Sequence, residues 1–437
     1  MTTAPHPVLT EAERAPYRRN LRVYLLFYAL YDLQMWMAIW VTFLIEDIGL
    51  SFTAITTIAV PFWLIVAFGQ VPAGAIADRW GRAWSLRAGS LVFGLSMLIL
   101  GAANSLEMVI VSWVVWAFAM IMVMGADSAL LHDSLKALGR EREFEKWAGR
   151  TFAVRSASIV VATLAGGAIA GEFGLRLPIL LGVIASTLAC LAAFQLREPP
   201  TSGVVTRVSY RDTFSTATRT VWRLPAVRGV IAFVAVLLAG TMTSEYLLQP
   251  FLLRHDVEVG FTFSALQVPV RVMGIVGAVF AFWWVGKVGE RAALGLLPLA
   301  VLGAYVGLTL VDSLGAIGFL MFAGLVRAAA LPLAEGYINR RVPSDQRATI
   351  LSLNHMAFAL LVVFTLPLLG FAVDRWDVRW TFGGAAAVMA VLTLIIGTLW
   401  ARAHTQPADV APAGTATAWP RGSLLVGVMK GQARSGD

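Results

Sequence analysis

The chain contains 437 residues, of which 58% are hydrophobic and 14% are charged, and its mean hydropathy is +0.74. Soluble proteins carry about 25% charged residues, so this composition excludes a soluble globular enzyme and a disordered or fibrous chain. The single cysteine, Cys190, excludes a disulfide framework, and the five scattered histidines show no metal-ligand spacing. We therefore expect an all-α, polytopic membrane protein without a metal or other cofactor.

Twelve apolar stretches follow one another along the chain, each near the roughly 20 residues that a bilayer requires. The first six lie near residues 21–45, 52–77, 88–104, 107–131, 151–171 and 177–196. The second six lie near residues 227–253, 262–286, 292–312, 315–338, 348–373 and 378–401. The sequence thus predicts two six-helix halves, over residues 21–196 and 227–401, joined by a linker over residues 197–226. Two tails, residues 1–20 and 402–437, complete the chain.

Basic residues orient this bundle. Of the 34 lysines and arginines, 28 fall in the tails and in the connections on one side, and this number includes Arg155. The positive-inside rule therefore predicts a multi-pass protein of the cell membrane with the linker and both termini in the cytoplasm. The net charge of +8 is then a signal of topology, and nucleic acid is excluded as a partner.

The tails and the linker are polar. Residues 1–20 lack the apolar centre of a signal peptide, and the Ala-, Gly-, Thr- and Pro-rich residues 402–437 are expected to be mostly disordered. In the linker, apolar residues recur at helical spacing from Tyr210 to Val221, with arginines between them. This pattern suits a helix lying on the inner leaflet, and a solvated linker is an equally good interpretation.

One motif recurs at the end of every third predicted span. It reads GAIADRWGR after the second span, GAIAGEFGLR after the fifth and GFAVDRWDVR after the eleventh. The eighth span ends in a reduced copy, GKVGER, which has no aspartate. Four copies predict a bundle of three-helix units, with a binding site between the two halves near the middle of the membrane.

Over about residues 20–401 the chain resembles the major facilitator superfamily. The connection after the second span matches the family signature G-x-x-x-D-R-x-G-R at Gly74, Asp78, Arg79, Gly81 and Arg82. Residues 125–141 and 339–349 look like a bacterial, exporter-like branch. The resemblance implies alternating-access transport of a small solute. The family's drug–proton antiporters carry a Gly-Pro pair in the fifth span, whereas residues 156–167 contain glycines and no proline.

The signature residues suggest a gate on the cytoplasmic side. Gly81 permits a tight turn and Gly74 permits close helix packing. In the family, the aspartate braces the two halves, so Asp78 is expected to meet the amides that begin the eleventh span. Arg82 is expected to pair with Asp133. The alternative is that Arg79 and Arg82 serve only as topology markers.

Six ionisable residues stand well inside predicted spans, where an unpaired charge costs several kcal/mol: Asp32, Asp127, Glu245, Arg271, Arg327 and Glu335. Arg327 and Glu335 lie eight residues apart on one helix face and are expected to neutralise each other. Glu245 is expected to pair with Arg271. Asp32 and Asp127 remain without a basic partner, which suits proton carriers, unless they only bond to nearby hydroxyls.

Polar, aromatic and flexible side chains on the same faces define a candidate substrate cavity: Tyr28, Trp36, Met124, Glu245, Gln249, Arg271, Arg327, Glu335 and Asn354. Packing and lipid contacts are the alternative for the apolar ones. A fixed hydrogen bond to a neighbouring helix is expected for His355 in preference to proton relay.

The leading prediction is a monomeric, lipid-embedded secondary transporter that exports a small amphipathic or drug-like solute in exchange for protons. One alternative is proton-coupled uptake of a small organic anion held by Arg271 and Arg327. Another is a sensor or scaffold that no longer transports. The chain has no P-loop, nucleophile elbow or metal motif, so we expect neither an enzyme nor an ATP-driven pump.

Overall fold

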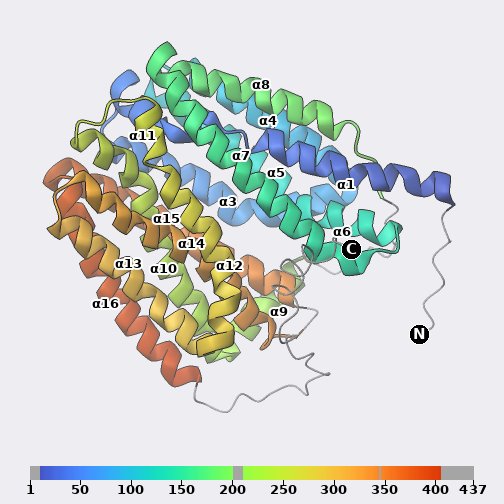
Figure 1. Cartoon of the computed structure of the whole chain (residues 1–437). Coiled ribbons are helices and arrows are strands. Elements are labelled where there is room, and N and C mark those ends of the chain that lie inside the picture. The colour runs from blue at the N-terminus through green and yellow to red at the C-terminus, as the bar shows by residue number, and fades with distance from the viewer. Residues whose placement is uncertain (1–9, 200–209, 344–345, 405–437) are drawn as a thin grey trace, which may run out of the picture.

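The chain folds as a bundle of helices with two halves that lie side by side (Figure 1). A computed structural model describes residues 10–199, 210–343 and 346–404, apart from the side chains of residues 70–76, 78, 210–213, 282 and 404. These residues form helices and no strand. Within them, 11 helices are long and apolar enough to cross a membrane, and the interrupted first segment makes the twelfth span. The predicted all-α, twelve-span fold is confirmed.

The first half begins with a segment broken into α1 (Glu11–Tyr31), η1 (Met35–Ala38), α2 (Trp40–Thr42) and η2 (Phe43–Asp47). It continues with α3 (Phe52–Trp80), α4 (Arg82–Gly101), α5 (Leu106–Met124), α6 (Asp127–Ala137), η3 (Glu141–Glu143), α7 (Phe144–Phe173) and α8 (Arg176–Ala193). Helix α1 starts ten residues before the predicted span, at a capping box in which Thr10 and Glu13 bond to each other's backbone amide.

The predicted linker contains the helix α9 (Tyr210–Arg223), which packs against the second half through a hydrogen bond of 2.7 Å between Thr220 and Gln346. The second half contains α10 (Pro225–Arg254), α11 (Phe261–Ala265), α12 (Val268–Val288), α13 (Glu290–Leu310), η4 (Leu314–Ala316), α14 (Ile317–Asn339), α15 (Arg347–Trp376) and α16 (Val378–His404). Residues 200–209 and the predicted C-terminal tail beyond 404 lie outside the described residues.

The fourfold motif corresponds to four turns of one geometry. The residues that end α3, α7, α12 and α15 all have φ between +79° and +101°: Gly81, Gly174, Gly289 and Asp377. Glycine suits this region because a Cβ is strained there, and Asp377 is the exception. The reduced copy after the eighth span therefore keeps the turn although it lost the aspartate.

The two halves are joined at one end of the bundle, which carries the loops after α4, α10 and α13. We call it the outer end, after the predicted orientation. There the Asp374 carboxylate at the end of α15 accepts hydrogen bonds from the amides of Phe52 (3.0 Å) and Thr53 (2.8 Å) at the start of α3. A Cβ on Gly167 of α7 would lie 1.7 Å from the hydroxyl oxygen of Ser264 in α11. The outer end is thus closed.

Candidate functional site

An acidic cluster lies in the first half, where α1, α6 and α7 meet. The Arg155 guanidinium of α7 bonds to the Asp32 carboxylate at 2.6 Å and lies over the Tyr28 ring, 4.5 Å from its centroid. The Tyr28 hydroxyl, which is fully buried, donates to the Asp127 carboxylate at 2.9 Å. The four side chains form one chain of contacts, which we call the N-terminal cluster.

Both acids sit where a helix is interrupted. Asp32 caps the end of α1, and Asp127 opens α6 after the break at Gly125 and Ala126. The Asp127 carboxylate also accepts a hydrogen bond from the amide of Ser128. A helix N-terminus exposes free amides with partial positive charge, so it stabilises a carboxylate at this depth.

The prediction that Asp32 has no basic partner is wrong, because Arg155 pairs with it. Arg155 was counted as a topology marker, although the predicted fifth span starts at residue 151 and already contains it. Its position inside a span was the signal that identifies it as a site residue. Asp127, by contrast, forms no ion pair with any described residue, so it is the carboxylate that remains without a counter-ion.

The second half pairs its charges differently from the prediction. Arg327 of α14 bonds to Glu245 of α10 at 3.2 Å, and Glu335 lies 3.8 Å from the Nε2 atom of His355 on α15. The predicted pairings of Arg327 with Glu335 and of Glu245 with Arg271 are therefore wrong. Eight residues along one helix separate Arg327 and Glu335 by about 12 Å, whereas Glu245 faces Arg327 from the adjacent helix.

Polar side chains of the second half bind the interrupted backbone of the first span. The Gln249 amide accepts from the backbone amides of Val41 (3.0 Å) and Thr42 (3.2 Å) and donates to the Met37 carbonyl (3.1 Å). Gln267 donates to the Ala38 carbonyl at 2.9 Å. Irregular backbone at membrane depth needs such partners, because lipid supplies none. We call these contacts the outer latch.

Arg271 also contacts this segment, but it has no acidic partner in the described chain. One of its terminal nitrogens donates to the Met37 carbonyl at 3.4 Å, and its buried Nε atom makes no hydrogen bond. Gln249 was predicted to face the substrate, and here it is 2% exposed and its amide is occupied by the first span. Neither role was visible from the sequence, because nothing in it shows that residues 32–39 leave the α-helix.

Aromatic rings line the contact between the halves. Trp63 of α3 meets Phe358 of α15 across this contact, with ring centroids 5.2 Å apart, and within the first half Trp36 packs edge-on against Trp116 of α5 at 5.0 Å. Trp36 is 1% exposed, and its indole nitrogen makes no hydrogen bond in the described chain. Trp63 and Trp116 were not singled out from the sequence, although its 15 tryptophans were a signal.

Two further predicted cavity residues, Met124 and Asn354, differ in exposure. Met124, at the end of α5, is 41% exposed. Asn354 of α15 is 2% exposed, and neither polar atom of its amide has a hydrogen-bond partner in the part of the chain described. His355 has its Nδ1 atom 3.1 Å from the Leu351 carbonyl, so this hydrogen bond lies within α15 and not, as predicted, to a neighbouring helix.

The signature connection forms an ion pair within the first half. Arg82 bonds to the Asp133 carboxylate of α6, as predicted, and donates to the Ala129 carbonyl at 2.9 Å. The surroundings of Gly74 and the side chain of Asp78 lie outside the described part of the chain, and Arg79 is exposed. Glu198, which follows α8, accepts from the Arg82 and Ala83 amides at 2.8 and 2.9 Å and so caps α4.

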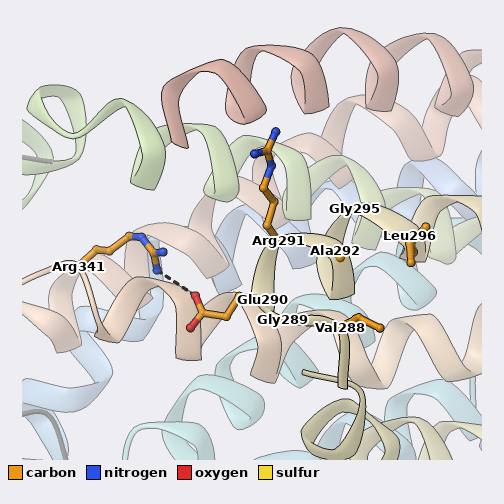
Figure 2. Close-up of a pocket in the computed structure, with 8 residues that line it drawn as sticks. All are labelled: Val288, Gly289, Glu290, Arg291, Ala292, Gly295, Leu296 and Arg341. Atoms are coloured by element: carbon orange, nitrogen blue, oxygen red, sulfur yellow. Dashed lines mark hydrogen bonds and ion pairs between the residues drawn. The ribbon is translucent and has the colours of Figure 1, made fainter. Parts of the chain in front are cut away.

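The corresponding turn of the second half carries the opposite charge. Glu290 follows Gly289 as Arg82 follows Gly81, and it pairs with Arg340 and with Arg341 at the end of α14. Figure 2 shows Arg341 reaching Glu290 across a surface hollow between α12 and α13. None of the residues that line this hollow belongs to the N-terminal cluster or to the pairs Arg327–Glu245 and Glu335–His355, so we do not assign the site there.

The described residues thus form a helical membrane bundle with two related halves, buried charges at helix breaks and contacts between the halves at one end. This arrangement is typical of a membrane transporter of small solutes. The family model of the Major Facilitator Superfamily matches residues 24–322, and the chain belongs to this superfamily. The protein is a transporter of small molecules and not an enzyme.

Two proteins of Bacillus subtilis (strain 168) are similar in sequence. Multidrug resistance protein 1 is 25% identical over 84% of this chain and 91% of its own length. Multidrug resistance protein 2 is 25% identical over 73% of this chain and 79% of its own length. This distance supports a relation within the superfamily.

Solved structures share the fold. The nucleoside transporter NupG superimposes with a TM-score of 0.73 at 11% identity, over 88% of this chain and 99% of that chain. A bacterial homologue of the human lysosomal transporter Spinster, in its inward-facing and unoccupied conformation, superimposes with a TM-score of 0.71 at 16% identity, over 90% and 99% of the two chains. At such low identity these structures establish the architecture alone.

Proposed function

We propose that this transporter exports a small amphipathic or drug-like compound from the cytoplasm in exchange for protons. The observation that carries the proposal is the charge balance of the N-terminal cluster, in which Arg155 pairs with Asp32, whereas Asp127 bonds to the Tyr28 hydroxyl and the Ser128 amide and forms no ion pair with a described residue. An acidic side chain at membrane depth that no base neutralises is a functional candidate, and we assign the transported proton to Asp127 on this ground. Asp127 then takes up a proton where water reaches it from outside and releases it inside.

The substrate cavity is proposed to lie between the halves, beside the aromatic rings and the two charged clusters. Export agrees with the names of the two Bacillus relatives, both multidrug resistance proteins. The excess of basic residues on the side of the linker supports cytoplasmic termini in the cell membrane. In this proposal Asp32 stays paired with Arg155, and Asp127 is the principal proton carrier.

Gating at the inner end is proposed to use the signature connection. Gly81 provides the turn, Arg82 and Asp133 fix it to α6, and Asp78 braces the start of α15 when the inner end is closed. Asp78→Asn should then fold normally and transport poorly. Cysteine accessibility from both faces should show more molecules open to the inside. Unchanged transport together with unchanged accessibility would remove Asp78 from the gate.

The proton carrier is tested in proteoliposomes with an imposed pH gradient, a pH dye inside and ethidium as the probe compound. Asp127→Asn mimics the protonated form permanently, so gradient-driven ethidium movement should stop while ethidium binding persists. Asp32→Asn leaves Arg155 unpaired, so it should lower protein stability as well as transport. Proton movement at the wild-type rate in Asp127→Asn would disprove the assignment.

Uptake of an organic anion is the second candidate, and Arg271 favours it because it forms no ion pair with a described residue and its buried Nε atom makes no hydrogen bond. Arg327, its predicted companion, is already neutralised by Glu245. If an anion is the substrate, Arg271→Gln should abolish uptake of a probe such as benzoate into the same liposomes. Export of ethidium unaffected by Arg271→Gln supports the first candidate.

A further inference from the structure

A second hollow, of about 570 Å³, lies at the inner end of the first half between the start of α1 and the start of α7. Five arginines line it: Arg18, Arg19, Arg22, Arg140 and Arg150. None of the residues that line it belongs to the N-terminal cluster or to the proposed gate. We call it the basic hollow.

The charges of the basic hollow are not balanced. Arg18 pairs with Glu11 at 2.6 Å, and Arg140 pairs with Glu143 at 2.6 Å. The other three arginines have no carboxylate partner in the described chain: Arg19 bonds to the neutral Gln195, Arg150 stacks on Trp147 and Arg22 makes no polar contact. The hollow of Figure 2 differs, because its lining includes the carboxylate of Glu290, which pairs with Arg341. The basic hollow therefore presents three positive charges that the protein does not neutralise.

A buried polar group in the lining also lacks a partner. Trp147 is 8% exposed, and its indole N–H makes no hydrogen bond within the described chain. The neighbouring Glu143 carboxylate accepts hydrogen bonds from two Arg140 nitrogens, at 2.6 and 2.7 Å, and makes no hydrogen bond of regular geometry with the indole. A buried donor without an acceptor is costly. An oxygen-rich anion in the hollow supplies that acceptor.

The depth of the hollow decides the source of the anion. Leu21, which lines it, is 2% exposed and begins the buried apolar face of α1, whereas Arg18, Arg19 and Arg22 are exposed. Arginines thus surround the point where the apolar part of the bundle begins. Guanidinium groups bind phosphate oxygens in pairs, and basic hollows at this level suit lipid head groups, whose acyl chains continue along the apolar surface.

We propose that the basic hollow binds the head group of an anionic phospholipid. The lipid phosphate lies among Arg19, Arg22 and Arg150 and accepts from Trp147. The bound lipid joins α1 to α7, the two helices that hold Asp32 and Arg155. Anionic lipid thereby stabilises the N-terminal cluster from the inner leaflet.

The test measures binding of phosphatidylglycerol to the purified full chain by native mass spectrometry, with phosphatidylcholine for comparison. The double change Arg22→Gln with Arg150→Gln should weaken phosphatidylglycerol binding roughly 30-fold, as expected for two basic side chains at an anionic head group. Trp147→Phe keeps the ring and loses only the N–H, so it should weaken binding about fivefold.

The matched control is Lys287→Gln with Arg291→Gln, which removes two positive charges from the same end of the bundle outside the basic hollow and should leave binding unchanged. Wild-type affinity in the Arg22 and Arg150 double variant overturns the proposal. So does displacement of phosphatidylglycerol by millimolar inorganic phosphate, because the hollow then serves a free anion. Equal loss in the control variant indicates nonspecific attraction and also overturns it.

Discussion

Replacement of Gln249 by leucine should open the outer end of the transporter. The side chain is 2% exposed and holds three backbone groups of the interrupted first span, those of Val41, Thr42 and Met37. Leucine fills a similar volume and bonds to none of them. In the closed form the amides of Val41 and Thr42 then lose their acceptor inside a dry interface, while in an outward-open form water reaches them.

The size of the effect follows from those two amides. A buried donor without a partner costs about 1–3 kcal/mol, so the closed form loses at least about 2 kcal/mol relative to the open form. At 1.4 kcal/mol for a factor of ten, the ratio of open to closed molecules rises roughly 30-fold. The Met37 carbonyl adds less, because Arg271 still donates to it.

Distances between two spin labels, measured by double electron–electron resonance, report the opening of the outer end. Labels on Asn104→Cys and Ser313→Cys, both exposed at the outer end, are introduced in a Cys190→Ala background. Gln249→Leu should move the distance distribution to longer values. Thr241→Val is the control, since this buried hydroxyl donates only to the Leu238 carbonyl of its own helix. An unchanged distribution in a folded Gln249→Leu protein would refute the latch.

Three further outcomes are expected. Arg155→Ala should lower the melting temperature in detergent more than Arg155→Ala combined with Asp32→Asn, because the single change leaves a bare carboxylate; equal losses would mean that the pair is not mutually neutralising. Gly167→Ala should open the outer end as Gln249→Leu does, since its Cβ would lie 2.6 Å from a backbone carbonyl of the second half; an unchanged spin-label distance would contradict this. Desolvation raises the pKa of Asp312, but the hydrogen bond and charge of Arg254 outweigh it and hold the pKa below its ordinary value. The pair therefore stabilises the fold above about pH 4 and is lost as the pH falls through the lowered pKa, so a stability deficit of Asp312→Asn near neutral pH should vanish in acid.

The sequence alone determined the spans, the turns and the family. Apolar length is a local property that needs no tertiary contact, and the recurring motif marks turns whose backbone geometry depends on one residue each. The turn at Gly81 was predicted for that reason, and the family resemblance implied the pairing of Arg82 with Asp133. The start of α1 at Glu11 was missed, because a polar extension of a membrane helix carries no apolar signal.

Only the tertiary structure decided which charges meet. A one-dimensional pattern places Arg327 and Glu335 on one face, but the partner of Arg327 depends on the rotation and level of α10, which brings Glu245 to it. Arg155 reaches Asp32 because α7 crosses α1 where the first span unwinds. That unwinding is itself tertiary: the free backbone groups of residues 37–42 are stable only because Gln249 and Gln267 arrive from the other half. The chain specifies these side chains, and packing of the two halves decides what they bind.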